Sequence, residues 1–296
     1  MLARMMKYAS RSVVSNIQAC CTSAANAKKL DGKVAIVTAS TDGQVETEIN
    51  MRMRIIGFAI AKNLAENGAS VVISSRKQKN VDTAVEKLKS EGLNKIVGVV
   101  CNVGNATQRN NLFETAIREF GGLDILVSNA AVNPQIGPVL ECTEEVWDKS
   151  FEINVKAGYL LAKQAVPHLK KRGGGSIVFV SSIVGYQSSK VPFKIYILGV
   201  YAVSKTALFG LTKAASLELA TENIRVNCLA PGIVATKFAA AITTGPAKEV
   251  ALSMIPMNRL GKPEDMGGVV TFLCSDDASY ITGETIVVAG GMTSRL

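Results

Sequence analysis

Short apolar runs alternate with helical patterns from residue 33 onward, and this alternation is the feature that most constrains the fold. The runs are rich in Val and Ile and apolar nearly throughout, as expected when both faces of a sheet are covered. Seven strands are predicted, at residues 33–39, 70–75, 95–103, 123–130, 175–182, 224–232 and 285–291. Helices are predicted between them, at residues 56–67, 80–91, 106–119, 143–172, 201–221 and 263–275. The sequence therefore predicts an α/β fold with a doubly wound, seven-stranded parallel sheet flanked by helices.

Length and charge predict one large domain preceded by a basic leader. Of the 296 residues 48% are hydrophobic, and no linker divides residues 31–296, so we expect this stretch to form a single domain. Residues 1–30 contain five Lys and Arg side chains and no acidic residue, within a net charge of +9. The other charges form no basic stripe, which argues against nucleic-acid binding. No apolar run approaches the ~18 residues that cross a bilayer, so no membrane span is expected.

Both ends of the chain resemble targeting signals. The basic stretch at residues 1–30 is similar to a mitochondrial transit peptide, with a disordered leader or a mistaken start codon as the alternatives. The final residues Ser294, Arg295 and Leu296 resemble the S-K-L address of peroxisomal proteins. We expect a peroxisomal location, with the mitochondrion as the alternative.

Cysteine and histidine usage argues against metal chemistry. The six cysteines include no C-x-x-C pair, so neither a zinc site nor a disulfide framework is expected; they are residues 20, 21, 101, 142, 228 and 274. His168 is the single histidine, and its place at a polar helix end favours a surface position over a Ser-His-Asp triad. No metal site is predicted.

Chemistry is expected where the strands end, because open parallel sheets bind ligands beyond the carboxyl ends of their strands. Ser182 ends the fifth predicted strand, and Tyr201 and Lys205 stand four residues apart in the next predicted helix, so they share one face. A phenol has a pKa of about 10, and a neighbouring ammonium is expected to lower it, which would make Tyr201 a general acid or base. Hydride transfer fits these residues better than acyl transfer.

A second pair, Tyr186 and Lys190, has the same spacing. It begins four residues after Ser182 and no helical apolar pattern follows it, whereas "TALFGLTKAASLELA" follows Tyr201. We therefore assign the catalytic role to Tyr201.

Several motifs together resemble those of the short-chain dehydrogenase/reductases. Beside the Y-x-x-x-K pair, the chain has "NAA" at 129–131, "INV" at 153–155, "SS" at 181–182 and "PGIVAT" at 231–236. The resemblance runs from about residue 31 to residue 296, and it implies a Rossmann-like fold, NADP(H) as cofactor and a homotetramer. It also implies an oxidoreductase that reduces ketones and aldehydes or oxidises retinol-like alcohols. Residues 237–258 resemble the variable substrate lid, and their small apolar side chains suggest hydrophobic substrates, although core packing explains them as well.

The resemblance implies a role for each matching residue. Tyr201 would transfer the proton, Ser182 would orient the substrate oxygen, and Lys205 would bind the nicotinamide ribose. Asn154 would hold a water that links the lysine to solvent in a proton relay. The residues expected to bind the cofactor are Thr38, Ser40, Gly43, Ile56, Gly57, Ser75, Arg76, Lys77, Asn102, Val103, Asn129, Ala130, Tyr201, Lys205, Pro231, Gly232, Ile233 and Thr236.

The residues after the second predicted strand favour NADP(H) over NAD(H). An enzyme for NAD usually has an Asp or Glu there to bind the ribose 2′-hydroxyl, but this chain has Ser75, Arg76 and Lys77. A guanidinium binds phosphate in a bidentate fork, so the stretch suits a 2′-phosphate. A solvated turn is the alternative.

Two insertions interrupt the family's motifs. Residues 38–43 match the start of the phosphate-binding loop T-G-x-x-x-G-x-G, with Ala39 at the first glycine, but the pattern resumes only at Ile56 and Gly57. Residues 44–55 are therefore surplus, and residues 191–197 lengthen the interval between Ser182 and Tyr201.

The first insertion has opposed consequences for folding and for binding. Lengthening the loop from about 6 to 18 residues adds only about 1 kcal/mol to the entropic cost of closing it, so the fold can tolerate the insertion. If helical, it would separate Gly43 from Gly57 by about 21 Å, whereas an insertion that loops outward would let the two halves close. Losing about 3 to 4 kcal/mol of phosphate contacts would weaken binding several hundredfold. A catalytically impaired isoform or pseudoenzyme is therefore the alternative function, and translation of unspliced sequence is an alternative origin of both insertions.

Overall fold

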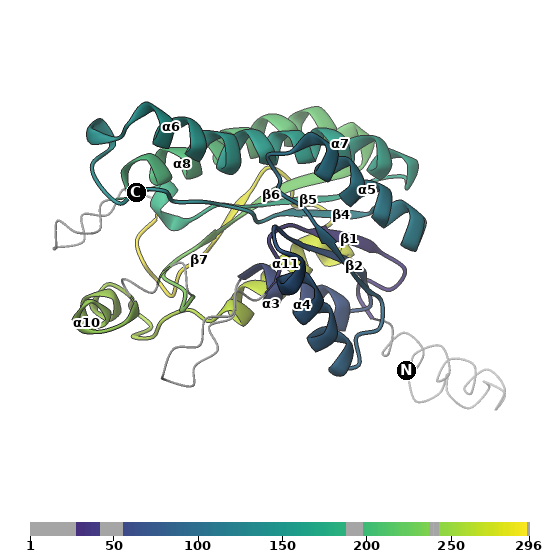
Figure 1. Ribbon diagram of the computed structural model, residues 1–296, viewed down its shortest axis with the longest axis horizontal. Coiled ribbons are helices and arrows are strands. Elements are labelled where there is room, and N and C mark those ends of the chain that lie inside the picture. Colours follow the sequence, from purple (N-terminus) through teal and green to yellow (C-terminus); the bar gives the residue numbers. More distant parts are fainter. Residues whose placement is uncertain (1–27, 42–55, 188–197, 237–238, 240–242, 295–296) are drawn as a thin grey trace, which may run out of the picture.

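Seven parallel strands form one sheet in the computed structural model (Figure 1), in the order β3-β2-β1-β4-β5-β6-β7. The structure describes residues 28–41, 56–187, 198–236, 239 and 243–294; Gly43, both insertions and most of the basic leader lie outside them. The strands are β1 (Val34–Val37), β2 (Ser70–Ser75), β3 (Ile96–Val100), β4 (Ile125–Ser128), β5 (Gly175–Val180), β6 (Ile224–Pro231) and β7 (Thr285–Val288). The predicted doubly wound α/β fold is therefore confirmed.

Helices cover both faces of the sheet (Figure 1). The apolar sides of α3, α4 and α11 pack on one face, and those of α5, α7 and α8 on the other. The α-helices are α3 (Ile56–Glu66), α4 (Gln78–Ser90), α5 (Ala106–Phe120), α6 (Glu144–Phe151), α7 (Ala157–Lys171), α8 (Gly199–Leu219), α10 (Pro246–Ser253) and α11 (Pro263–Cys274). Short turns of 3-10 helix are η1 (Val139–Glu141), η3 (Ile183–Gly185), η5 (Ala220–Glu222) and η7 (Asp276–Ala278).

The helical layer differs from the prediction in two places. The single helix predicted at residues 143–172 is divided into α6 and α7 by a π-helical turn, η2 (Glu152–Lys156). An apolar pattern cannot distinguish one wider turn, and such turns inside helices are frequent at functional sites. The short helix α10 lies in the stretch predicted only as a substrate lid, because its eight residues are too few for the periodicity to stand out.

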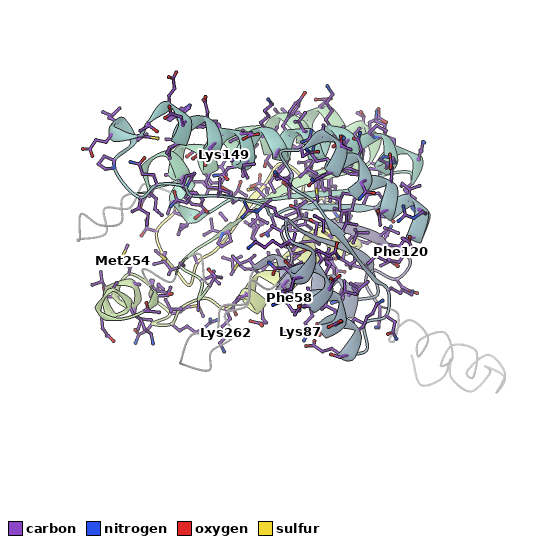
Figure 2. All side chains as sticks on the ribbon, viewed as in Figure 1. Phe58, Lys87, Phe120, Lys149, Met254 and Lys262 are labelled. Carbon is purple, nitrogen blue, oxygen red and sulfur yellow. The ribbon has the colours of Figure 1, made fainter. Side chains whose placement is uncertain are left out.

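The core consists of two apolar layers, one on each face of the sheet. Phe58 on α3 is fully buried in the first layer. The Nζ atom of Lys87 on α4 lies 4.8 Å from the centroid of the Phe58 ring, so the lysine covers this side of the layer (Figure 2). Leu112 on α5 and Leu161 on α7 fill the second layer. Burying a side chain of this size stabilises the fold by about 1.5 to 3 kcal/mol.

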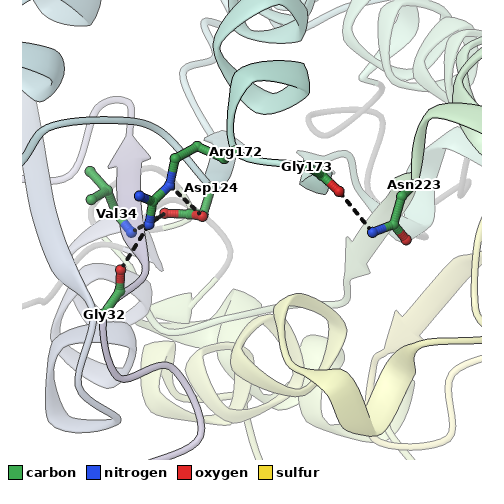
Figure 3. Close-up of polar contacts among 6 residues, drawn as sticks. All are labelled: Gly32, Val34, Asp124, Arg172, Gly173 and Asn223. Carbon is green, nitrogen blue, oxygen red and sulfur yellow. Dashed lines mark hydrogen bonds and ion pairs between the residues drawn. The ribbon is translucent and has the colours of Figure 1, made fainter.

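A buried carboxylate ties the chain together at the amino ends of the strands (Figure 3). Asp124 is 4% exposed, and its Oδ2 atom accepts from the Val34 N–H at 2.8 Å. Arg172, at the end of α7, donates from Nε to Asp124 Oδ1 at 3.1 Å and from Nη2 to Oδ2 at 3.2 Å. Beside it, the side-chain amide of Asn223 donates to the Gly173 carbonyl at 2.9 Å. We call Asp124, Arg172 and Val34 the amino-edge clamp.

Replacing Asp124 by Asn should lower the free energy of unfolding by about 2 to 3 kcal/mol, because hydrogen bonds to a buried charge are lost. Urea unfolding measures this change. Glu222→Gln is the matched control: Glu222 pairs with Lys170 at 2.6 Å, but both side chains are 43% exposed. The control should therefore change the free energy by less than about 0.5 kcal/mol. Equal effects of the two substitutions would contradict the importance of the clamp.

Candidate active site

The loop after β1 is folded back onto β2 by Ser40. The Ser40 N–H donates to the Ser74 carbonyl at 2.9 Å, and its hydroxyl donates to the Val37 carbonyl at 2.6 Å. The same hydroxyl accepts from the Ser74 N–H at 3.0 Å. Ala39 has a φ of 49°, a left-handed conformation that is uncommon for a residue with a Cβ atom. The backbone at Ala39 thus has the conformation that suits the glycine of the family's pattern.

Asn129 connects this loop to the end of β4. Its Nδ2 atom donates to the carbonyls of Thr38 and Ala39, both at 3.1 Å. The Thr38 hydroxyl accepts from the N–H groups of Asn129 at 3.0 Å and Ala130 at 3.1 Å. Four hydrogen bonds therefore join the ends of two neighbouring strands.

Gly57, on the far side of the first insertion, lies against the same loop. A Cβ atom on Gly57 would stand 2.5 Å from the Asn129 Nδ2 atom and 2.6 Å from the Ala39 carbonyl oxygen. Only glycine permits this approach of backbone to backbone. The start of α3 therefore meets the loop after β1 although twelve inserted residues separate the two stretches in sequence.

Cationic side chains follow β2. Ser75 is half-buried, and Arg76 and Lys77 are exposed. The Cys101 N–H, just past β3, donates to the Ser75 carbonyl at 2.8 Å, so the ends of β2 and β3 lie side by side.

The loop after β3 is held by α5. The Asn102 N–H donates to Gln108 Oε1 at 2.7 Å, and the Val103 carbonyl accepts from Arg109 Nη1 at 2.6 Å. Asn102 and Val103 were predicted as site residues, but Gln108 and Arg109 were not. The one sequence signal for Arg109 is that a charged residue stands on the buried side of α5, in register with Leu112.

Ser182, Tyr201 and Lys205 meet at the end of β5. Tyr201 is 7% and Lys205 is 2% exposed, on the same side of α8. The Lys205 Nζ atom lies 5.5 Å from the centroid of the Tyr201 ring and donates to the Val180 carbonyl at 2.8 Å. The Tyr201 side chain is hydrogen-bonded to Ser182, the residue that precedes η3. A hydroxyl, a phenol and an ammonium thus share one small volume.

Burial dominates the ionisation of this cluster. It raises the pKa of Tyr201 above the usual range, and the hydrogen bond with Ser182 offsets this only in part. It lowers the pKa of Lys205 to about 8, against the opposing effect of the Cys228 thiol. The pKa of Tyr201 thus lies above its ordinary value in this structure, because desolvation of the phenolate outweighs the groups around it.

Asn154 lies in the π-helical turn, and protein groups occupy its side chain. Its Oδ1 atom accepts from the Val132 N–H at 2.8 Å, and its Nδ2 atom donates to the Val132 carbonyl and to Ser204 Oγ, both at 2.9 Å. Ser204 in turn donates to the Tyr201 carbonyl at 2.7 Å. Both amide protons of Asn154 are used, so its side chain fixes the loop after β4 to α8. Sequence reasoning missed Val132 and Ser204.

The loop after β6 packs against β7. The Gly232 N–H donates to the Val288 carbonyl at 2.9 Å, and a Cβ atom on Gly232 would lie 2.7 Å from the Ala289 Cα atom. Thr236 is buried, and Pro231 and Ile233 flank the glycine. A cavity of about 220 Å³ opens beside this loop, and its lining includes Gly232, Ile233, Ile255, Met257, Val288 and Ala289. Ile255 and Met257 come from the predicted lid.

The structure thus gathers many of the predicted residues into two groups along the carboxyl edge of the sheet, and others follow β2, β3 and β6. One surrounds Thr38, Ser40, Gly57 and Asn129, and the other contains Asn154, Ser182, Tyr201 and Lys205. Within the described ranges, no three His, Cys, Asp or Glu side chains are placed to hold a metal ion. Among the same residues, no helix is long and apolar enough to cross a membrane.

Comparison with known proteins gives consistent matches. The family model described as enoyl-(acyl carrier protein) reductase matches residues 51–293. Dehydrogenase/reductase SDR family member 4 of Bos taurus is 55% identical over 268 residues, which cover 90% of this chain and 89% of that protein. The protein of the same name in Oryctolagus cuniculus is 56% identical, with 90% and 96% covered. A candidate short-chain alcohol dehydrogenase from Sinorhizobium meliloti 1021 has a solved structure with a TM-score of 0.77 and 32% identity, covering 91% of this chain and 100% of that one.

Replacing Gly57 by Ala should lower the free energy of unfolding by about 1 to 3 kcal/mol, because the methyl group would overlap with Ala39 and Asn129. Thermal and urea unfolding measure the change. Gly268→Ala on α11 is the control, since a Cβ atom there meets nothing within 4 Å, and it should be neutral or stabilising by up to about 1 kcal/mol. A Gly57→Ala variant as stable as the control would mean that the two halves of the loop do not meet in solution.

Proposed function

Because the chain belongs to the short-chain dehydrogenase/reductase family, whose members are oxidoreductases, we propose that it transfers hydride between NADP(H) and a carbonyl or alcohol substrate. The observation that carries this proposal is the cluster of buried Tyr201 and Lys205 with half-buried Ser182 beside the carboxyl end of β5. A phenol, a hydroxyl and an ammonium close to one another can protonate and orient one oxygen atom. The proposal includes both directions of the reaction: reduction of ketones and aldehydes, and oxidation of retinol-like alcohols.

The residues around the loop after β1 fit a dinucleotide. Because Gly57 has no Cβ atom, the amino end of α3 approaches the backbone at Ala39 more closely than any other residue would allow. Backbone N–H groups at a helix amino end bind phosphate groups well. Thr38, Ser40 and Gly57 would hold the pyrophosphate in this proposal.

Each member of the cluster has one task in the proposed reduction. The bound nicotinamide supplies the hydride. Tyr201 donates its phenolic proton to the substrate oxygen, and Ser182 donates a hydrogen bond to the same atom. Lys205 returns a proton to Tyr201. Asn154 holds the loop after β4 and the helix that carries Tyr201 at a fixed separation, through Val132 and Ser204.

The cationic stretch after β2 supports NADP(H) as the cofactor. Arg76 and Lys77 are exposed beyond the end of the strand, where a carboxylate would select the ribose 2′-hydroxyl of NAD. A planar guanidinium matches two phosphate oxygens at once. We therefore assign the 2′-phosphate of NADP(H) to Ser75, Arg76 and Lys77.

Apolar residues of the lid support a hydrophobic substrate. Ile255 and Met257 line the cavity beside Gly232 and Ile233. The mammalian relatives are named dehydrogenase/reductases, which fits either direction of the proposed reaction. The substrate class in this proposal is a small hydrophobic carbonyl compound or the matching alcohol.

Assembly and location complete the proposal. The proposed assembly is a homotetramer, and Leu217 on α8, which is 82% exposed, and Tyr159 on α7, which is 45% exposed, are apolar side chains that a contact between subunits would cover. The terminal Ser294, Arg295 and Leu296 support import into the peroxisome, with the mitochondrion as the alternative from the basic leader.

Tyr201→Phe should lower kcat/KM for carbonyl reduction at least about a hundredfold, because the acid that protonates the oxygen is lost. NADPH binding, measured by fluorescence titration, should change little. The assay follows NADPH oxidation with an aromatic ketone. Tyr186→Phe is the control, since its ring stacks on Phe209 at 4.3 Å between centroids and has no assigned proton transfer.

Three outcomes bear on the proposal separately. Undiminished turnover by Tyr201→Phe would overturn the assignment of the acid. A preference for NADH over NADPH in the unaltered protein would overturn the cofactor. Cooperative unfolding without any NADPH binding would favour the impaired isoform, and a variant lacking residues 44–55 would then show whether the insertion is the cause.

Carbonyl reduction should also depend on the ionisation of Lys205, whose pKa burial lowers to about 8. Below that pH the lysine carries a proton and can return one to Tyr201; above it the proton is lost. We expect kcat to be level at lower pH and to fall about tenfold per unit above a pH near 8, in assays from about pH 6 to about pH 10. Lys205→Arg, which keeps its proton throughout, should abolish the fall in whatever activity remains. A rate in the unaltered protein that stays constant to about pH 10 would contradict the proton return.

A further inference from the structure

We propose that Arg109 is a positioning residue for the adenosine half of the cofactor: it fixes the loop Asn102–Val103 as a wall of the adenosine pocket. This inference rests on the proposed function, because it presumes that a dinucleotide binds along the carboxyl edge of the sheet. It assigns a role to a buried charge that the catalytic cluster does not use.

The first line of argument is the way α5 holds this loop from both sides. Gln108 accepts from the Asn102 N–H at 2.7 Å, and Arg109 donates from Nη1 to the Val103 carbonyl at 2.6 Å. The side chains of two successive residues, Gln108 and Arg109, thus hold the N–H of Asn102 and the carbonyl of the next loop residue, Val103. The loop turns at Gly104, whose N–H donates to Asn102 Oδ1 at 3.1 Å.

The second line of argument is that the charge of Arg109 is buried without a carboxylate to balance it. Arg109 is 6% exposed, and in the part of the chain that the structure describes no ion pair joins it to a carboxylate. A buried unpaired charge destabilises a fold, so loop closure alone would be served better by a neutral donor. The charge also acts on its surroundings, since it opposes the rise in the pKa of the Cys101 thiol that burial causes.

The third line is the position of the loop. Cys101 donates its N–H to the Ser75 carbonyl at 2.8 Å, and β2 and β3 pair in parallel with Ser75 opposite Val100. The loop held by Arg109 therefore continues directly beside Arg76 and Lys77, the residues assigned to the 2′-phosphate. A buried cation behind this wall favours a ligand that carries negative charge at the same corner.

Contacts from α7 keep Arg109 in place. Its Nε atom donates to Gln164 Oε1 at 3.3 Å, and Gln164 Nε2 donates to Asn110 Oδ1 at 2.6 Å. The amide of Gln164 thus bridges neighbouring residues of α5. Because Nε and Nη1 of Arg109 are both hydrogen-bonded, its side chain cannot turn outward without breaking two hydrogen bonds.

The test separates adenosine binding from catalysis. Arg109→Met in the full chain should raise the Kd of adenosine 2′,5′-bisphosphate, measured by calorimetry, about tenfold, or about 1.4 kcal/mol. KM for NADPH should rise by a similar factor while kcat stays within about twofold. With reduced nicotinamide mononucleotide, which lacks the adenosine half, kcat/KM should not change. Arg118→Met is the control, because Arg118 lies on the same helix but its side chain is 62% exposed.

Other outcomes would overturn the proposal. An equal loss with the mononucleotide would show that Arg109 supports the fold as a whole, and an unchanged Kd for the bisphosphate would show that the wall does not depend on it. Arg109→Lys, which keeps the charge but not the fork, should recover part of the affinity. If Arg109→Met does not fold, Gln108→Ala removes the other bond to the loop and must raise the Kd in its place. An unaltered protein that does not bind the bisphosphate would instead refute the cofactor assignment.

Discussion

The hydrogen bonds between Asn129 and the loop after β1 are the constraint on which the carboxyl edge of the sheet depends. β1 and β4 are neighbours, yet the chain leaves them in opposite directions, toward β2 and β3 on one side and toward β5, β6 and β7 on the other. A crevice is expected at such a reversal. The amide of Asn129 bonds the carbonyls of Thr38 and Ala39 there, and Gly57 seats α3 on the same atoms. The described residues on the two sides of the first insertion are thus held together at this point.

Burial favours the neutral form of both Tyr201 and Lys205. It raises the pKa of Tyr201 and lowers that of Lys205, because either charge loses hydration in the same small volume. The spacing of the two residues indicated that they would meet. It could not indicate the balance of charge, since desolvation depends on how β5, β6 and α8 close around the pair.

The sequence was sufficient for the strands because runs of Val and Ile mark strands buried on both faces. The rule that ligands bind beyond the carboxyl ends of strands selected Ser182, whereas Asn129 and most other site residues were predicted from the family resemblance. Contacts between distant segments, such as Asn154 with Ser204 or Arg109 with Gln164, have no such pattern. The π-helical turn was not predicted, because its five residues are too few for an altered period to stand out within a long helical pattern.

The amino-edge clamp lies at the opposite ends of the strands from Tyr201. Strands of four to eight residues span roughly 13 to 26 Å, which exceeds the ~10 Å beyond which the energetic effects of substitutions add independently. Changes that strengthen Asp124 and Arg172 and changes that reshape the lid should therefore combine without interference. Substitutions at the amino edge of the sheet can therefore raise stability, and substitutions at the carboxyl edge can change specificity, independently of each other.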